Sequence, residues 1–286
     1  MVRRRLADLT ATRFMLVVTI FVASIALLVA LGLFIKSLPI LRNQSLGQLL
    51  FSSSWHPSRG DFGMAPFIMG TIWVTVIAGL IALPLSILSA LYLAEYASNN
   101  VRAIAKPALD LLAGIPSVIY GLWGVLFLSL GGISIGFNVL AGAIVLAIMV
   151  IPVVTHVSEE VFRTVPRDIK EASLSVGATK WETSKHVVLR SSLPGLAAAA
   201  ILGFSRAFGE TMAVLMVVGN VPKSPTSILD PAYPLTALIA NNYGDMMSVP
   251  LYDSVLLFAA LILLIVIVVF NVMARMTLNR LERKWA

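Results

Sequence analysis

Arg206 and Glu210 are two ionisable residues inside an otherwise apolar or small-residue stretch, ILGFSRAFGETMAVLMVVGN, at residues 201–220. Counted from Pro194, Arg206 lies about 18 Å along a helix. If this segment crosses a membrane, both groups lie in hydrocarbon, where an uncompensated charge costs at least ~2.5–3.5 kcal/mol. Residues four apart share one helical face. The spacing therefore predicts that Arg206 and Glu210 pair, with Ser205 and Thr211 beside them.

Two functions fit such a pair. It could be an ion pair that locks helices together, or it could line a path for an anion. The planar guanidinium of Arg206 donates two parallel hydrogen bonds to an oxyanion, which favours a phosphate-like substrate. In that interpretation Glu210 holds Arg206 when the site is empty, and accepts a hydrogen bond from a protonated phosphate oxygen when it is full.

The composition predicts an integral membrane protein. Hydrophobic residues make up 58% of the 286 positions, charged residues only 12%, and the mean hydropathy is +0.92. Soluble domains carry about 25% charged residues. A helix needs ~20 apolar residues to cross the bilayer. Six stretches qualify, and they predict an all-α fold with six transmembrane helices: 14–35, 66–93, 104–130, 137–157, 194–220 and 251–275.

The distribution of cations predicts that both termini are cytoplasmic. With that orientation, sixteen of the 21 lysines and arginines lie inside, four lie outside, and Arg206 lies in the membrane. Positive charge accumulates on cytoplasmic loops. We expect a cytoplasmic segment at 1–13, a transmembrane domain at 14–276 with a cytoplasmic loop at 158–193, and a cytoplasmic tail at 277–286. The net charge of +7 reflects this asymmetry and does not indicate nucleic-acid binding.

The cytoplasmic loop at 158–193 carries helix start and stop signals. Pro166 suits a first helical turn, and Gly177 suits a helix C-terminus. Thr179 and Glu182 have the spacing of a capping box, which begins a second helix. The loop is therefore predicted to form an elbow in which a short helix, ending near Val176, is joined at Gly177 to a second helix.

Other polar or interrupted stretches lie near the predicted membrane. GIPSVIYG, at 114–121, combines Pro116 with Ser117 and Tyr120. It fits either ordinary packing of the bundle, since Pro and Gly are common in membrane helices, or a kinked helix that lines a polar path, which the polar side chains favour. The outer loops 36–65 and 221–250 mix Pro, Gly and Ser with aromatic residues. They fit either ordered linkers or a docking surface for an external partner.

Several chemistries have no support in the sequence. There is no GxxxxGK[ST] loop for ATP and no GxSxG nucleophile, so no catalytic residue is predicted. The three histidines lack metal-ligand spacing, and there are no cysteines. We therefore expect no enzyme activity, no metal site and no cofactor in this chain.

KEASLSVGA, at 170–178, resembles the EAA motif of permeases in ABC importers, with Glu171, Ala172, Gly177 and Ala178 at the family's positions. The resemblance implies a type I ABC importer permease fold, in which this loop is the coupling helix that docks on an ATPase. The motif ordinarily ends in a Leu-Pro pair. Arg190 stands at the expected proline, and Leu193-Pro194 follows four residues later.

AGIPSVIYG at 113–121 and RAFGETMAVLMVVGN at 206–220 resemble the permeases of phosphate-specific ABC importers, and GETMAV points to the PstC-type branch. WHP and DFGMAPFIMGT within 55–71, and SALYLAEY at 89–96, agree. The resemblance implies a bacterial inner-membrane permease that imports phosphate by alternating access. Its expected partners are a second homologous permease, two ATPase subunits that bind ATP and Mg, an external phosphate-binding protein and membrane lipid. It also implies a role for Arg206 and Glu210 in phosphate passage.

Three alternatives remain at this point. The substrate could be sulfate, molybdate or another oxyanion, which the EAA loop fits equally and GETMAV less well. The chain could be a secondary transporter, which would not need the docking elbow. It could also be a membrane scaffold, in which the Arg206–Glu210 pair would only hold helices together.

Overall fold

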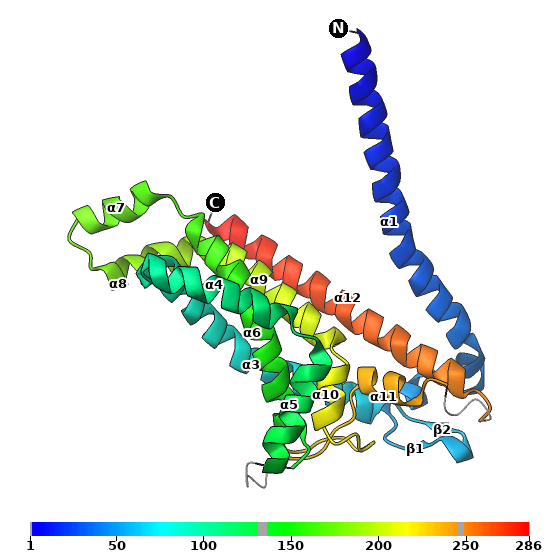
Figure 1. Cartoon of the computed structure of the whole chain (residues 1–286). Helices are drawn as coiled ribbons and strands as arrows, with labels where there is room; N and C mark the ends of the chain where they lie inside the picture. Colours follow the sequence, from blue (N-terminus) through cyan, green and yellow to red (C-terminus); the bar gives the residue numbers. More distant parts are fainter. Residues whose placement is uncertain (1, 131–135, 245–248, 286) are drawn as a thin grey trace.

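The computed structural model describes residues 2–130, 136–244 and 249–285, which are mostly helical (Figure 1). The elements in chain order are α1 Val2–Asn43, α2 Leu46–Phe51, β1 Trp55–His56, η1 Pro57–Arg59, β2 Asp61–Phe62, α3 Ala65–Leu91, η2 Tyr92–Tyr96, α4 Asn99–Gly114, α5 Ser117–Leu130, α6 Val139–Arg163, α7 Arg167–Ser175, α8 Lys180–Glu182, η3 Thr183–Val188, α9 Leu189–Gly209, α10 Met212–Val217, α11 Leu235–Asn242 and α12 Tyr252–Trp285.

Five of the described helical segments are long and apolar enough to cross a membrane, and a bent pair, α4 and α5, makes a sixth if it counts as one span. The five are Thr10–Asn43, Ala65–Tyr96, Val139–Arg163, Lys180–Gly209 and Tyr252–Leu278. The predicted all-α fold with six transmembrane helices is confirmed. The expected terminal segments, 1–13 and 277–286, continue α1 and α12 as helix; Met1 and Ala286 lie outside the described residues.

The stretch predicted to span at 104–130 is broken at Pro116 into two helices. α4 ends at Gly114, α5 begins at Ser117, and the two axes differ by 92°. Pro116 explains the break, because proline has no amide hydrogen to donate and holds the preceding residue out of the helical region. Ile115 accordingly has an extended backbone, with φ −63° and ψ 130°. Pro84 and Pro152, in contrast, lie inside the continuous helices α3 and α6.

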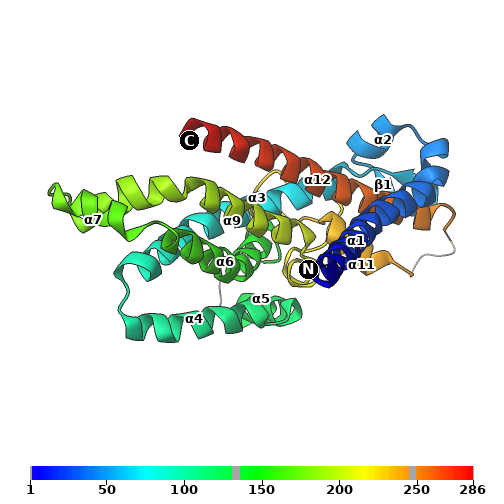
Figure 2. The same cartoon turned by 90° about the horizontal axis from the view of Figure 1, so that it is seen from above.

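The packed centre of the molecule is formed by α3, α6 and α9 (Figures 1 and 2). Lipid-embedded helices lack a hydrophobic drive to associate, so small residues that allow close backbone approach become important. Gly203 of α9 is one such residue, because a Cβ there would lie 2.5 Å from a methyl carbon of Val154 in α6. Gly79 of α3 likewise lies against the ring of Phe204.

The bent pair is attached to this centre by charge and by packing. Lys106 of α4 lies 3.1 Å from the carboxylate of Glu159, a residue of α6 that is only 2% exposed. Arg163 also pairs with Glu159. α5 packs against α10 and α6. Figure 2 shows α4 and α5 together along one side of the molecule.

The outer loops fold into an ordered cap at the end opposite α7 (Figure 1). Trp55 packs edge-on against Phe67, with ring centroids 4.7 Å apart, and Phe62 and Tyr233 are buried in the same cluster. These aromatic side chains act as internal packing of ordered linkers. Tyr243 remains exposed, and residues 245–248 of the second loop lie outside the described residues.

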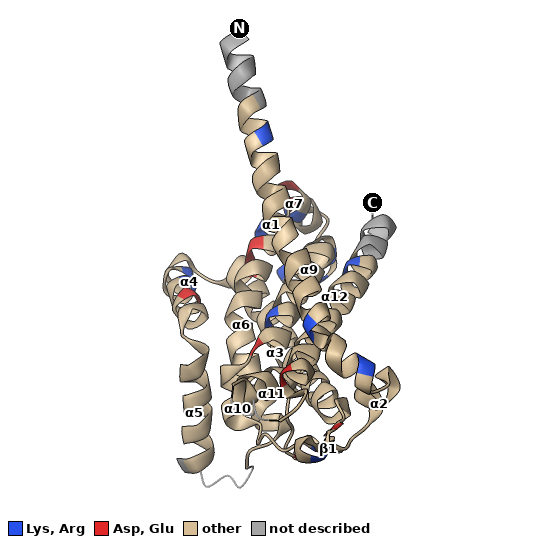
Figure 3. Cartoon of the chain, turned by 90° about the vertical axis from the view of Figure 1, so that its right-hand side faces the viewer, with Lys and Arg blue, Asp and Glu red and all other residues tan. Residues whose placement is uncertain are grey.

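Charged residues are rare through the middle of the bundle, where Figure 3 shows mostly uncharged residues along α5 and α6. Lysine, arginine, aspartate and glutamate lie on α4 and α7. This is the distribution expected for helices whose middle parts lie in hydrocarbon. The ends of the predicted loop 158–193 belong to the helical segments Val139–Arg163 and Lys180–Gly209, and α7 lies between them.

Candidate transport site and coupling elbow

Arg206 lies at mid-height of the apolar layer. It is in α9, one turn beyond Gly203, which packs against Val150 and Val154. Those two valines lie near the middle of α6, a helix of 25 residues. Its length of about 37 Å is sufficient to cross the hydrocarbon. The depth predicted for Arg206 is therefore consistent with the packing.

The side chain of Arg206 is exposed on the outer face of α9. Among the residues that the structure describes, no carboxylate lies within ion-pair distance of it.

Glu210 does not share a helical face with Arg206, so the predicted ion pair on one continuous helix is wrong. α9 ends at Gly209, and Glu210 has an extended backbone with φ −72° and ψ 130°. Its carboxylate accepts hydrogen bonds from the amides of Thr211, at 3.1 Å, and Ala213, at 3.4 Å. Glu210 therefore satisfies free amides at the start of α10, which would be costly to leave unpaired in a membrane.

A small cavity beside Glu210 was not predicted from the sequence. It is lined by Thr71 and Thr75 of α3, by Thr236 of α11 and by apolar side chains, with a volume of about 10 Å³. This is roughly the space of one water molecule, so it is too small for a phosphate. The spacing of Thr71 and Thr75, one turn apart in an apolar span, is the signal that could have identified them. No comparable sequence signal pointed to Thr236.

The remaining predicted path residues serve different contacts. Ser205 donates to Oδ1 of Asn271 at 3.0 Å and so joins α9 to α12. The hydroxyl of Thr211 lies 3.4 Å from the carbonyl of Gly209. Ser117 is half-buried at the start of α5. Tyr120 donates to the carbonyl of Leu112 at 2.7 Å, across the bend between α4 and α5.

The helix–Gly–helix turn of the predicted elbow is confirmed, and its second helix continues without a break from Lys180 to Gly209 through α8, η3 and α9. α7 ends at Ser175, and Gly177 has φ +91°, a conformation that L-amino acids with side chains rarely adopt. Thr179 and Glu182 form the capping box: the Thr179 hydroxyl accepts from the Glu182 amide, and Glu182 Oε2 accepts from the Thr179 amide at 2.8 Å. Hydrogen bonds from Thr179 keep the pKa of the Glu182 carboxyl below its usual value.

The residues of the EAA-like motif lie on the exposed surface of this elbow. Glu171 and Ala172 are exposed on α7, and Ala178 follows Gly177 before α8. No residue of α7 is buried. A helix that offers its side chains in this way, beyond the apolar layer, is suited to contact a cytoplasmic partner.

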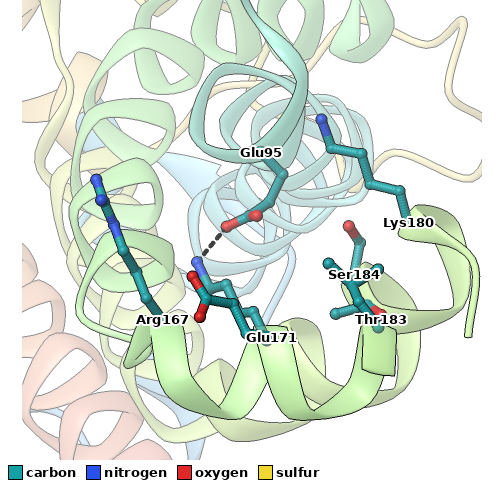
Figure 4. A pocket seen from close by; sticks show the side chains of 8 residues that line it. Glu95, Arg167, Glu171, Lys180, Thr183 and Ser184 are labelled. Atoms are coloured by element: carbon teal, nitrogen blue, oxygen red, sulfur yellow. Dashed lines mark hydrogen bonds and ion pairs between the residues drawn. The ribbon is translucent and has the colours of Figure 1, made fainter. Parts of the chain in front are cut away.

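A hollow of about 250 Å³ separates α7 from the inner end of α3 (Figure 4). Lys170 of α7 donates to Glu95 Oε1 of η2 at 2.6 Å, which closes one side of the hollow. The hydroxyls of Ser173 and Thr183 lie 2.9 Å apart and join α7 to η3. Arg167, Glu171, Lys180 and Ser184 complete the polar lining.

Among the described residues, no group of three or more histidine, cysteine, aspartate or glutamate side chains could hold a metal ion. Glu95 and Asn271 are further polar residues that sequence reasoning missed. Each forms its contact with a residue at least 66 positions away in sequence, so no local pattern marks it.

Comparison with known proteins identifies relatives over most of the chain. Residues 82–283 match the family model described as the binding-protein-dependent transport system inner membrane component. The probable ABC transporter permease protein YqgH of Bacillus subtilis is 35% identical over 267 residues, covering 90% of this chain and 86% of the relative. The phosphate transport system permease protein PstC of Xylella fastidiosa (strain Temecula1) is 38% identical over 258 residues, covering 82% of this chain and 79% of the relative.

The PstC protein of Mesorhizobium japonicum is 35% identical and covers 97% of this chain and 94% of its own length. Among solved structures, an inward-facing form of the MetNI methionine ABC transporter matches with a TM-score of 0.56. It is 21% identical and covers 74% of this chain and 93% of its own. At that identity the match concerns the fold, which is that of a type I ABC importer permease.

Proposed function

Since the chain belongs to the family of binding-protein-dependent transport system inner membrane components, we propose that it is the permease subunit through which an ATP-driven importer carries inorganic phosphate across the inner membrane. The curated relatives named PstC, at 31–38% identity, support phosphate as the substrate. As a transport component, the chain moves its substrate by alternating access, and ATP hydrolysis takes place on a partner subunit.

The observation that carries the proposal is the position of Arg206. It is an exposed cation at mid-membrane without an ionised partner among the described residues. Facing lipid, it would cost at least ~2.5–3.5 kcal/mol. Facing a water-filled path, the same guanidinium is solvated when the path is empty and binds an oxyanion through two hydrogen bonds when substrate passes.

The path lies on the surface of this chain and not inside it. The cavity beside Glu210, about 10 Å³ in volume, cannot admit phosphate. A second homologous permease, placed over the exposed face of α9, would convert that face into an enclosed path. We therefore propose an assembly of two permeases, two ATPase subunits that bind ATP and Mg, and an external phosphate-binding protein.

The path residues then have separate functions. Arg206 binds the passing oxyanion, and Tyr120 holds the bend between α4 and α5. Ser117 starts the helix that presents Tyr120. Glu210 and Thr211 form the helix break that ends α9, while Ser205 fixes α9 to α12.

The elbow is the proposed contact with the ATPase. Glu171 and Ala172 present an exposed face of α7, and Gly177 with Ala178 sets the angle to the next helix. α6 and α9 enter and leave the elbow along the chain. Movement of the elbow is therefore passed to the helix that carries Arg206.

Uptake by the purified complex in proteoliposomes tests the proposal. Labelled phosphate should enter when ATP is enclosed on the ATPase side and the binding protein is outside. Sulfate and molybdate should neither enter nor compete. Preferred uptake of sulfate or molybdate would assign the chain to another oxyanion, and uptake without ATP would make it a secondary transporter. No uptake of any oxyanion by an intact complex would contradict the proposal.

A further inference from the structure

Three helices approach the coupling elbow, but only two of them are joined to it by the chain. α6 leads into α7 through residues 164–166, and α8 with η3 leads directly into α9. α3 ends at η2, on the other side of the hollow, and has no covalent link to the elbow (Figure 4). Any movement of the elbow must reach α3 through side-chain contacts or through neighbouring helices.

Hydrophobic packing does not hold α7 in place, because none of its residues is buried. Its position rests on polar contacts at both ends of the hollow. Lys170 pairs with Glu95 at 2.6 Å, and both side chains are mostly shielded, with 19% and 13% exposed. Ser173 meets Thr183 at 2.9 Å, but that contact joins α7 only to η3. Among the polar contacts of the described residues, the Glu95–Lys170 ion pair is the one that joins α7 to the turn continuing α3.

Glu95 is itself firmly placed. It lies in η2, a π-helical turn that continues α3, and π-helical turns are often found at functional positions. Arg102 of α4 donates to the carbonyls of Leu93 at 2.6 Å and Ala94 at 2.7 Å. Those carbonyls lie in the turn that carries Glu95. A force on Glu95 therefore acts on the whole end of α3 and not on a loose side chain.

At its middle, α3 touches the proposed transport site. Gly79 packs against Phe204 of α9, two residues before Arg206, and Thr71 and Thr75 line the cavity beside Glu210. A displacement of α3 relative to α9 would therefore move the side chains that line the cavity next to the break at Glu210. A second contact joins α8 to η2: Nζ of Lys180 lies 4.6 Å from the ring centroid of Tyr96. It also holds the elbow close to the turn that continues α3.

We propose that Glu95 and Lys170 are a positioning pair that makes α3 move together with the coupling elbow, so that substrate delivery outside and ATP hydrolysis inside remain linked. This inference rests on the proposed function. The pair touches neither phosphate nor ATP, and its effect is on coupling. Apolar packing of Ala90 and Leu91 against Phe162, Val165 and Val188 holds the inner end of α3 to α6 and η3; the ion pair adds the connection from α3 to α7, and without it α7 can change its angle without moving the end of α3.

Charge reversal in the full complex tests the pair. Glu95→Lys and Lys170→Glu should each leave assembly and basal ATP hydrolysis intact, while stimulation of hydrolysis by the binding protein falls about fivefold. Phosphate uptake should fall in parallel. The double variant Glu95→Lys with Lys170→Glu should recover at least half of the lost stimulation, since opposite charges face each other again. Lys185→Glu, the same reversal at an exposed lysine of η3, is the matched control.

A reversible covalent link gives a second test, because the chain contains no cysteine. In the variant Glu95→Cys with Lys170→Cys, stimulation should be low. It should return when a short bis-thiosulfonate reagent bridges the two thiols, and be lost again on reduction. Normal stimulation in the single reversals, or no recovery in either the double reversal or the bridged variant, would overturn the inference.

The wild-type complex separates this inference from the proposed function. If the wild-type complex hydrolyses ATP in response to the binding protein but takes up no phosphate, the proposed substrate is wrong. The role of the Glu95–Lys170 pair is then still tested by the stimulation of ATP hydrolysis. If phosphate enters normally and the reversals have no effect, the proposed function stands and the positioning role of Glu95 and Lys170 fails.

Discussion

The coupling elbow and the break at Glu210 both interrupt a helical path, but they satisfy the backbone in different ways. At the elbow, Gly177 makes the turn, Thr179 caps the next helix, and exposed backbone groups can bond to water. At the break inside the membrane, no water is available to bond to free backbone groups. Glu210 binds the amides of α10 with its own carboxylate, while Thr236 donates to its carbonyl at 3.0 Å.

This difference implies different sensitivity to substitution. The turn of the elbow depends on Gly177, Thr179 and Glu182, which lie within six residues, and no side chain of α7 is buried. The membrane break depends on packing among α3, α6 and α9 and on a residue of α11. Changes at the elbow should therefore alter coupling while the bundle remains folded. Changes near the break should alter the fold of the bundle.

Overpacking next to the break should give the largest effect on stability. In Gly203→Leu, the new side chain would meet Val154 and Val150, whose methyl groups lie 2.5 and 3.2 Å from an added Cβ. We expect a loss of about 1–3 kcal/mol of unfolding free energy. Thermal unfolding of the purified complex would measure it. Gly32→Leu, at a site of α1 with no atom within 4 Å of an added Cβ, is the matched control. Equal melting temperatures for the two variants would contradict the packing account.

A change at the elbow should act on coupling more than on stability. Gly177→Val forces a β-branched residue to adopt φ +91°, which costs of order 1–3 kcal/mol locally. We expect the elbow to turn differently, so that ATPase association or stimulated hydrolysis falls while the melting temperature of the bundle is unchanged. Co-purification of the ATPase and assays of hydrolysis would check this. Full retention of the ATPase together with normal transport would show that the elbow is not the coupling element.

The smallest expected effect is a response of the elbow to pH. The folded pKa of Glu182 is lowered by hydrogen bonds from Thr179. The stability that the ionised Glu182 carboxylate contributes to the elbow is therefore fully present above the unfolded pKa of about 4.3. It is lost as the pH falls through the lower folded pKa. In a variant with Trp181 as the only tryptophan, fluorescence should change over that acid range. Glu182→Gln should remove the transition, and an unchanged transition in that variant would assign it to another group.

The same contrast explains what the sequence could predict. Gly177, Thr179 and Glu182 are close together in the chain, and their spacing indicates the elbow without knowledge of the fold. The break at Glu210 carries no proline; Gly209 is its one local stop signal, and glycine is common inside membrane helices. One group that satisfies the break comes from Thr236, in a different element. The segment 194–220 therefore looks like one continuous span.

The bend at Pro116 was only partly predictable. Proline indicates a kink, but the angle of 92° depends on the attachment of α4 to α6 through Lys106 and Glu159. The orientation of Arg206 was not predictable, because α9 is apolar or small on all sides near it. Only the packing of Gly203 and Ala207 shows which face is buried and leaves Arg206 exposed.

The most direct test of the central claim is ATP-dependent phosphate uptake per assembled complex in proteoliposomes, for wild type, Arg206→Lys and Arg206→Gln. Two charge-assisted hydrogen bonds are lost in Arg206→Gln, so uptake should fall on the order of 100-fold. Arg206→Lys keeps the charge but loses the fork, which should cost about tenfold. Because Arg206 has no ionised partner among the described residues, both variants should assemble with the ATPase normally. Uptake by Arg206→Gln within twofold of wild type would contradict the claim that phosphate passes Arg206.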